Sequence, residues 1–285
     1  MVSSPLTRSI PHYIGVTGVQ APEQVDRLVD AAARHQFGPG CSHTTMIGCL
    51  VSPGLLTDGK PSHTSKPYRH VMSRGVLTEI LSAAKERGAI GMLHFELTKT
   101  WPGDPGDVQP VLSLLSALSK ANLFPPVQLN GIFRAEDINE IHREAGVPLV
   151  LQLRKELSDL SETELLRYVE SIAASISKIL MDPSAGAGLK IDLEPAVKLQ
   201  RAIERHFPHV FTFGYAGGLG GGSEPQIAHT SAVIHTLKTA LGDSLFSVDT
   251  ETNVRSAGEQ PNTDELDIDL CDVYFSTVRA GLNRP

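Results

Sequence analysis

The segment from Lys178 to Ser223, KILMDPSAGAGLKIDLEPAVKLQRAIERHFPHVFTFGYAGGLGGGS, decides the fold class. A short apolar strand ends at Asp182 and runs into a turn of small residues. A helical stretch and a second strand follow, and this strand stops at the glycine-rich run 217–222. Two strands separated by a helix, each with polar or glycine residues at its carboxyl end, are typical of a parallel α/β sheet whose site lies at the strand ends.

The same alternation of strand and helix extends along the chain. Short apolar runs predict strands at residues 12–16, 45–51, 90–97, 126–129, 149–153, 179–182, 210–215 and 245–249. Helices are predicted at residues 76–87, 108–121, 135–144, 194–206, 226–241 and 264–282, and two more begin at Pro22 and at the capping-box sequence Ser161-Glu162-Thr163-Glu164. Eight strand–helix pairs favour a closed barrel over an open doubly wound sheet. We therefore predict a single (β/α)8 barrel domain over residues 1–285, with extended βα loops such as residues 52–69.

Composition narrows the class of protein. The 285 residues are 41% hydrophobic, with 25 glycines and 19 prolines, which is typical of a globular, loop-rich chain. A net charge of −7 without a cluster of Lys and Arg argues against nucleic acid or an anionic membrane as the main partner. Three cysteines without C-x-x-C spacing predict neither a disulfide framework nor a thiolate zinc site. No apolar leader or membrane span is recognisable, so we expect a soluble, cytoplasmic protein.

Two features of the opening segment could carry chemistry. The backbone N–H groups of Gly217, Gly218 and Gly220 could converge on a phosphate, which in barrels commonly lies between the loops after the seventh and eighth strands. A tight turn without a ligand is the alternative. Asp182 ends an apolar strand, where a carboxylate could act as a general acid or base at the barrel mouth. Its alternative is to cap the following turn.

Other strand ends add polar residues that describe a pocket lining. On successive strands, polar residues share one face: His94, then Gln128 with Asn130, then Gln152 with Arg154. Asp249 and Glu251 follow on the eighth strand, where they could orient a sugar hydroxyl or hold a cation, although Glu251 could equally be a solvated acid. Arg154 could bind a substrate carboxylate or phosphate, or form a structural salt bridge. We expect no cofactor. We expect no metal either, because His94 and Glu96 together supply too few ligands.

Several short motifs, in the same order along the chain, resemble phosphoribosylanthranilate isomerase, the barrel enzyme of tryptophan biosynthesis. They are Met181-Asp182 with Gly186 and Gly188, Tyr215-Ala216-Gly217-Gly218-Leu219, Val248-Asp249, Val127-Gln128-Leu129-Asn130-Gly131 beside the family's V-Q-L-H-G, and Ile14-Gly15-Val16-Thr17 beside its C-G-I-T. Each motif is short, but together they cover nearly the whole chain.

The resemblance implies an Amadori rearrangement, in which an Asp of the sixth strand protonates the ribose ring oxygen and a Cys of the first strand removes a proton from the sugar carbon. Asp182 would then be the acid. Gly217, Gly218 and the loop after Asp249, with Asn253, would hold the phosphate.

This chain differs from the family at the position of the catalytic base. Ile14 stands in place of the catalytic Cys, and Asn130 in place of the family's His. His12 replaces the usual preceding Lys and is expected to line the substrate pocket. Because isoleucine cannot accept a proton, His94 or Cys49 would have to replace the base.

We therefore predict a divergent isomerase-like barrel that acts on a small phosphorylated, sugar-type substrate by proton transfer, of the aldose–ketose type, as a monomer or homodimer. The alternative is a non-catalytic barrel that retains the phosphate pocket as a binding or assembly module.

Overall fold

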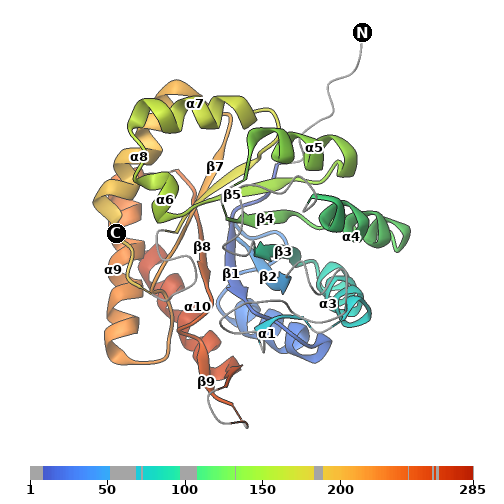
Figure 1. Cartoon of the computed structure of the whole chain (residues 1–285). Helices are drawn as coiled ribbons and strands as arrows, with labels where there is room; N and C mark the ends of the chain where they lie inside the picture. The colour runs from blue at the N-terminus through green and yellow to red at the C-terminus, as the bar shows by residue number, and fades with distance from the viewer. Residues whose placement is uncertain are drawn as a thin grey trace.

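Eight parallel strands close into one barrel in the computed structural model (Figure 1), which describes residues 9–51, 69–71, 73–96, 108–131, 133–182, 189–242, 244–258, 260 and 263–284. Each strand pairs with the next along the chain, and the eighth pairs with the first. The strands are β1 (Tyr13–Thr17), β2 (Thr44–Val51), β3 (Ile90–Glu96), β4 (Val127–Asn130), β5 (Leu149–Leu153), β6 (Lys178–Met181), β7 (Thr212–Ala216) and β8 (Ser247–Thr250). The predicted (β/α)8 barrel is confirmed.

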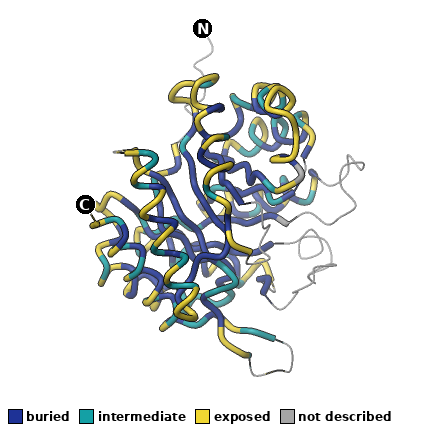
Figure 2. Tube along the Cα trace, turned by 90° about the vertical axis from the view of Figure 1, so that its left-hand side faces the viewer, coloured by how far each residue is buried: buried dark blue, intermediate teal, exposed yellow. Residues whose placement is uncertain are grey.

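Helices surround the barrel, with buried sides toward the strands and exposed sides toward solvent (Figure 2). They are α1 (Pro22–Arg34), α3 (Arg74–Glu86), α4 (Val108–Lys120), α5 (Ala135–Ala145), α6 (Lys155–Ser158), α7 (Glu162–Ile172), α8 (Leu193–His206), α9 (Glu224–Leu241) and α10 (Ile268–Asn283). The capping box predicted at the start of α7 forms, because Ser161 Oγ accepts from the Glu164 amide while the Glu164 carboxylate accepts from the Ser161 amide. Across the described residues, no helix combines the length and apolar character that a membrane span requires.

The end of the chain differs from the prediction of one helix over residues 264–282. A two-stranded antiparallel hairpin, β9 (Arg255–Ala257) and β10 (Asp264–Leu266), precedes α10. The helix begins later because the Asp267 side chain accepts from the amides of Asp269 and Leu270, at 3.0 and 3.2 Å. An N-cap at this position fixes the first turn of α10, so Asp264 lies in a strand rather than in the helix.

Alternation along β1 separates two cores. Ile14 belongs to the large apolar core that includes residues of the surrounding helices, whereas Tyr13 packs inside the barrel with Met46 and Met92. Gly15 also faces inward, since a Cβ there would lie 2.4 Å from Met46 Cε. Ile14 therefore faces away from the barrel interior and cannot mark the place of a missing catalytic base.

The amino-terminal end of the barrel interior holds a buried lysine. Lys178 is 0% exposed, its Nζ donates to Ser247 Oγ at 2.9 Å, and the same nitrogen lies 5.1 Å from the centre of the Tyr13 ring. Burial lowers the pKa of Lys178 to about 7. The predicted turn 183–188 and the predicted loop 52–69, apart from Arg69, lie outside the described residues.

Candidate active site

A pocket lies at the carboxyl ends of the strands, where barrel enzymes place their chemistry. Its volume is about 40 Å³. The predicted site residues that line it are His94, Asn130, Asp182, Gly217, Gly218, Asp249, Glu251 and Asn253. Gln128 and Gln152, also expected at strand ends, line the pocket as well, and the structure adds Thr250, which the sequence analysis did not name.

Asp182 is held by a chain of two buried amides. Gln152 Nε2 donates to Asp182 Oδ2 at 2.7 Å, and Gln128 Nε2 donates to Gln152 Oε1 at 3.0 Å. All three side chains are at most 5% exposed. This chain of hydrogen bonds orients the Asp182 carboxyl group.

Asp249 is a second buried carboxylate, in different surroundings. The Thr17 hydroxyl donates to it, with Oγ1 at 3.1 and 3.0 Å from its two oxygens. Burial, together with the negative charges of Glu251 and Asp182, raises the pKa of Asp249 well above its ordinary value, although the Thr17 hydrogen bond acts in the opposite direction. Asp249 therefore retains its proton to a higher pH than an ordinary Asp.

His94 lies beside the same hydroxyl, with Thr17 Oγ1 at 3.4 Å from both ring nitrogens. Burial lowers the pKa of His94 to about 3, so the ring is neutral near pH 7 and is a weak base. Cys49, the other predicted replacement base, faces away from the pocket in the large apolar core, and burial raises its pKa to about 12. Neither group is well suited to remove a proton from carbon.

The glycine-rich run divides into two parts. Gly217 and Gly218 line the pocket with φ angles of +118° and +70°. A Cβ on Gly218 would lie 2.9 Å from the Lys190 Cα and 3.2 Å from His229 Nε2, so only glycine fits this approach. A lysine and a histidine thus flank the pair of glycines predicted to bind phosphate.

The second part of the run holds the neighbouring loop instead. The Gly220 amide donates to Thr230 Oγ1 at 2.9 Å, and the amides of Gly221 and Gly222 both donate to the Asn253 carbonyl at 3.2 Å. The Asn253 side chain in turn accepts from Gln226 at 2.8 Å. The N–H group that the phosphate prediction assigned to Gly220 is therefore already paired.

Two other predicted pocket residues lie elsewhere. Arg154 follows β5 and approaches Asn130 Oδ1 at 3.5 Å, at the same end of the barrel as the pocket but outside its lining. His12 precedes β1 at the amino-terminal end of the barrel, with its ring centroid 6.4 Å from that of His43. Burial, Lys178 and His43 lower the pKa of His12 to about 4. The structure does not bring His12 to the pocket, because a residue before a parallel strand lies at the opposite end from one that follows it.

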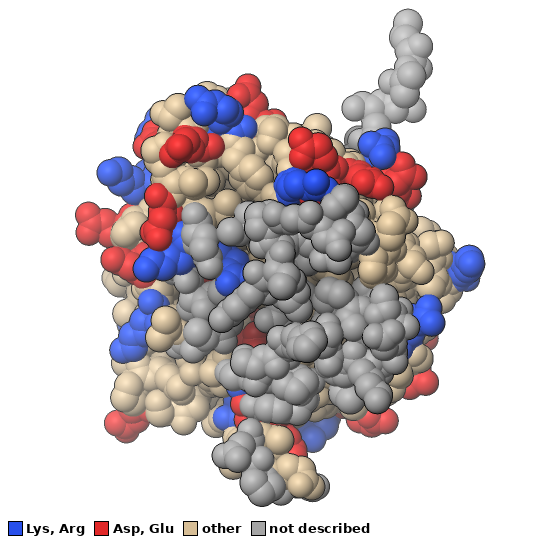
Figure 3. Space-filling model, in the orientation of Figure 1, with Lys and Arg blue, Asp and Glu red and all other residues tan. Residues whose placement is uncertain are grey.

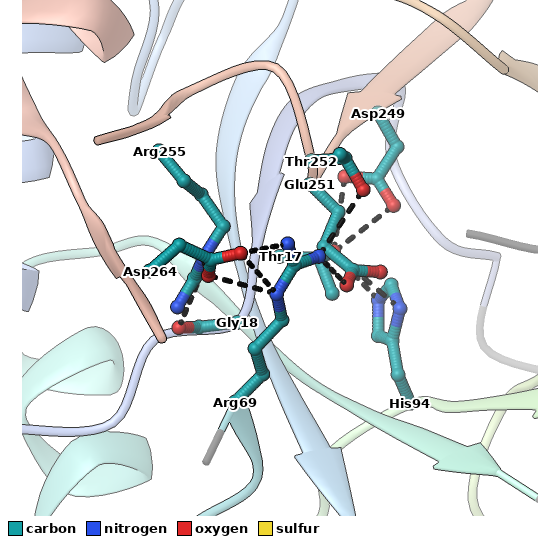
Figure 4. Close-up of polar contacts among 9 residues, drawn as sticks. All are labelled: Thr17, Gly18, Arg69, His94, Asp249, Glu251, Thr252, Arg255 and Asp264. Carbon is teal, nitrogen blue, oxygen red and sulfur yellow. Dashed lines mark hydrogen bonds and ion pairs between the residues drawn. The ribbon is translucent and has the colours of Figure 1, made fainter. Parts of the chain in front are cut away.

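An arginine–carboxylate cluster, formed by Arg69, Glu251, Arg255 and Asp264, lies beside the pocket (Figure 4). Arg69 Nη1 donates to Glu251 Oε1 at 2.9 Å, and both arginines donate to the Asp264 carboxylate. Glu251, predicted to face substrate, is thus also committed to an ion pair. The sequence gives little signal for this cluster, because Arg69 is separated from its partners by more than 180 residues.

Charged side chains are mixed on the surface of the described residues. On the face that Figure 3 shows, the described Lys and Arg side chains are scattered among Asp and Glu side chains rather than gathered into a basic patch. Within the described ranges, no group of three or more His, Cys, Asp or Glu side chains could hold a metal ion.

Neither a scan against protein-family models nor a search of curated proteins finds a match. Solved structures are similar in fold. Phosphoribosylanthranilate isomerase from Pyrococcus furiosus has a TM-score of 0.52 and 13% identity over 94% of this chain and 99% of that one. D-psicose 3-epimerase from Clostridium cellulolyticum has a TM-score of 0.51 and 12% identity over 96% and 97%. DAHP synthase from Thermotoga maritima has a TM-score of 0.52 and 11% identity over 96% and 69%. At these identities the likeness supports the barrel fold and does not single out phosphoribosylanthranilate isomerase.

Proposed function

We propose that the chain is an enzyme that moves protons on a small sugar-type substrate, with Asp182 and Asp249 as its acid–base pair. The observation that carries this proposal is the presence of two buried carboxyl groups in one pocket with different hydrogen-bond donors: the Gln152 amide donates to Asp182, whereas the Thr17 hydroxyl donates to Asp249, whose pKa is raised by burial. Paired titratable groups whose surroundings differ in this way are the usual arrangement for acid and base roles.

The two roles follow from the surroundings. Asp249 retains its proton and acts as the acid, and Asp182 is the acceptor. This assignment reverses the role that the family resemblance implies for Asp182. His94, neutral and buried, contributes a hydrogen-bonding group rather than the base.

The pair suits an isomerisation or epimerisation next to a carbonyl group. Asp182 would remove the proton from the adjacent carbon while Asp249 protonates the carbonyl oxygen, giving an enediol. Return of the protons to other positions would give the product, so the reaction needs no oxidant or cofactor. Proteins of similar fold include an isomerase, an epimerase and an aldolase by name.

We assign the phosphorylated end of the substrate to Gly217 and Gly218, beside the Lys190 backbone and His229 and at the edge of the pocket, away from the proposed acid–base pair. The most specific form of this proposal is phosphoribosylanthranilate isomerase activity in tryptophan biosynthesis. Failure to complement a tryptophan auxotroph that lacks the isomerase would refute that form alone.

The general form is tested by hydrogen exchange. Aldose and ketose phosphates, including D-ribose 5-phosphate, are incubated with the protein in D2O, and deuterium incorporation at carbon is followed by NMR. We expect incorporation with the natural chain and a loss of about a hundredfold or more in Asp182→Asn and in Asp249→Asn. Asp272→Asn, on the outer helix α10, is the matched control. No exchange with any aldose or ketose phosphate would refute the proposal.

The poor suitability of His94 and Cys49 as replacement bases favours a second candidate, a non-catalytic barrel that binds a phosphorylated compound at its rim. It predicts binding of D-ribose 5-phosphate without exchange, and affinity that Asp182→Asn leaves unchanged.

A further inference from the structure

Gln128 lines the pocket and carries a buried hydrogen-bond acceptor without a partner among the described residues. Its side chain is 3% exposed and lines the pocket. Its Nε2 donates to Gln152, but its Oε1 is buried and has no hydrogen-bond partner among the described residues. A buried acceptor without a partner is costly, so an oxygen in this position points to a donor that arrives with a ligand.

The direction of the amide chain fixes which atom of Gln128 is left without a partner. Gln152 turns its NH2 group toward Asp182 and donates to the carboxylate. The Gln152 oxygen then faces Gln128, whose NH2 group donates to it. The remaining atom of Gln128, its oxygen, is therefore set by Asp182 two side chains away.

The surroundings determine what can pair with this oxygen. The pocket lining contains three acidic side chains, Asp182, Asp249 and Glu251, and no Lys or Arg among the described lining residues. A carbonyl, carboxylate or phosphate oxygen at Gln128 would meet another acceptor in an acidic setting. A hydrogen-bond donor is the complementary partner, and the hydroxyl group is the donor that the proposed sugar-type substrate carries.

We propose that Gln128 is a specificity-determining residue that accepts a hydrogen bond from a hydroxyl group of an uncharged, polyhydroxylated part of the substrate. The inference rests on the proposed function, because it takes this pocket as the substrate site. It adds to that function by assigning two parts of the substrate to two places: a hydroxyl group binds at Gln128, and any phosphate binds at the edge of the pocket.

The test uses ligands that lack phosphate. Dissociation constants of D-fructose and D-ribose, and of each of their monodeoxy analogues, are measured by NMR titration of the full chain. For at least one of the two sugars, we expect one deoxy analogue to bind the natural chain at least about tenfold more weakly than the parent sugar does. The analogue lacks the hydroxyl group that would donate to Gln128 Oε1, so this oxygen stays unpaired. In Gln128→Met, the same analogue and its parent should bind equally.

Gln200→Met is the matched control, since Gln200 is also 3% exposed but lies on α8, outside the pocket lining. It should keep the preference for the parent sugar. If Gln128→Met does not fold, the Gln128 side-chain carbonyl carbon of the natural chain gives a second measurement: its 13C resonance should shift with the parent sugar and not with the analogue.

Equal binding of every analogue to the natural chain would overturn the proposal and would mean that only water faces Gln128. A preference that persists in Gln128→Met, or no binding of either parent sugar, would overturn it as well. The proposed reaction is tested separately. If no deuterium exchange is seen but the natural chain still shows a preference that depends on Gln128, the reaction is refuted and the hydroxyl site remains.

Discussion

Replacement of Lys178 by methionine should stabilise the protein and should do so in a pH-dependent way. Lys178 is 0% exposed, and burial lowers its pKa from 10.5 to about 7. The unfolded chain therefore binds a proton more tightly than the folded chain, and this difference opposes folding. Its contribution is fully unfavourable below pH 7 and disappears as the pH rises toward 10.5.

The size of the effect follows from the two pKa values. At 1.36 kcal/mol per unit, the contribution of Lys178 disfavours folding by about 4 kcal/mol at pH 7 and by about 2 kcal/mol at pH 9. Methionine removes this cost but gives up the hydrogen bond to Ser247, worth about 1 kcal/mol. The Ser247 hydroxyl still accepts from the Tyr13 amide at 3.0 Å. We expect Lys178→Met to be more stable by about 3 kcal/mol at pH 7, and this advantage to shrink by about 2 kcal/mol at pH 9.

Urea unfolding of both proteins at pH 7, 8 and 9 measures the difference. This window lies above the ordinary pKa of the neighbouring His12 and His43, so their titration does not contribute. Titration of the buried Cys49 and Cys271 above pH 8 is common to both proteins and cancels. Lys198→Met, on the exposed side of α8, controls for the loss of a positive charge. Parallel curves for the natural chain and Lys178→Met would refute the reasoning, because they would mean that Lys178 is equally protonated in both states.

Three further outcomes are expected. Asp264→Asn should lower the free energy of unfolding by about 2 kcal/mol at pH 6, measured by urea unfolding, since it weakens the partner of two buried arginines. Burial alone would raise the pKa of Asp264, but its arginine hydrogen bonds lower it, so this difference should vanish as the pH falls below 3.8. Thr17→Val should raise the pKa of Asp249 further, as read from its 13C carboxyl resonance, because the lost hydroxyl hydrogen bond lowers that pKa. Ser161→Ala should cost about 1 kcal/mol in the same urea assay through loss of the α7 cap, and a change near zero would mean that the capping box is not formed in solution.

The barrel could be predicted from sequence because each strand buries an apolar run and each helix has an apolar stripe with a recognisable start. β5 was predicted with its bounds, Leu149–Leu153, and α1 with its first residue, Pro22. The hairpin β9–β10 was not predicted, because its three-residue strands have no apolar alternation. An ion pair between the distant residues Arg69 and Asp264 contributes to that region, and such a pair leaves no periodic pattern.

The site could be predicted in part for a related reason. Strand polarity alone places Asp182 and Asp249 at one end of the barrel, and both line the pocket. The side of a strand on which a residue lies depends on the register of the barrel. Ile14 appeared to stand in place of a base, whereas Thr17, on the inner face of β1, is the residue that donates to Asp249. His12 was assigned to the pocket although it precedes its strand, and this position alone puts it at the other end.

Burial acts on both ends of the barrel interior in the same direction. It moves Lys178, at the start of β6, and Asp249, on β8, toward their uncharged forms, because both exchange water for an apolar interior. Asp182 accepts a hydrogen bond from a buried amide, whereas Asp249 accepts one from the Thr17 hydroxyl. Under the proposed function, Asp182 would take a proton from the substrate while Asp249 gives one to it, so the net charge of the pocket would stay the same.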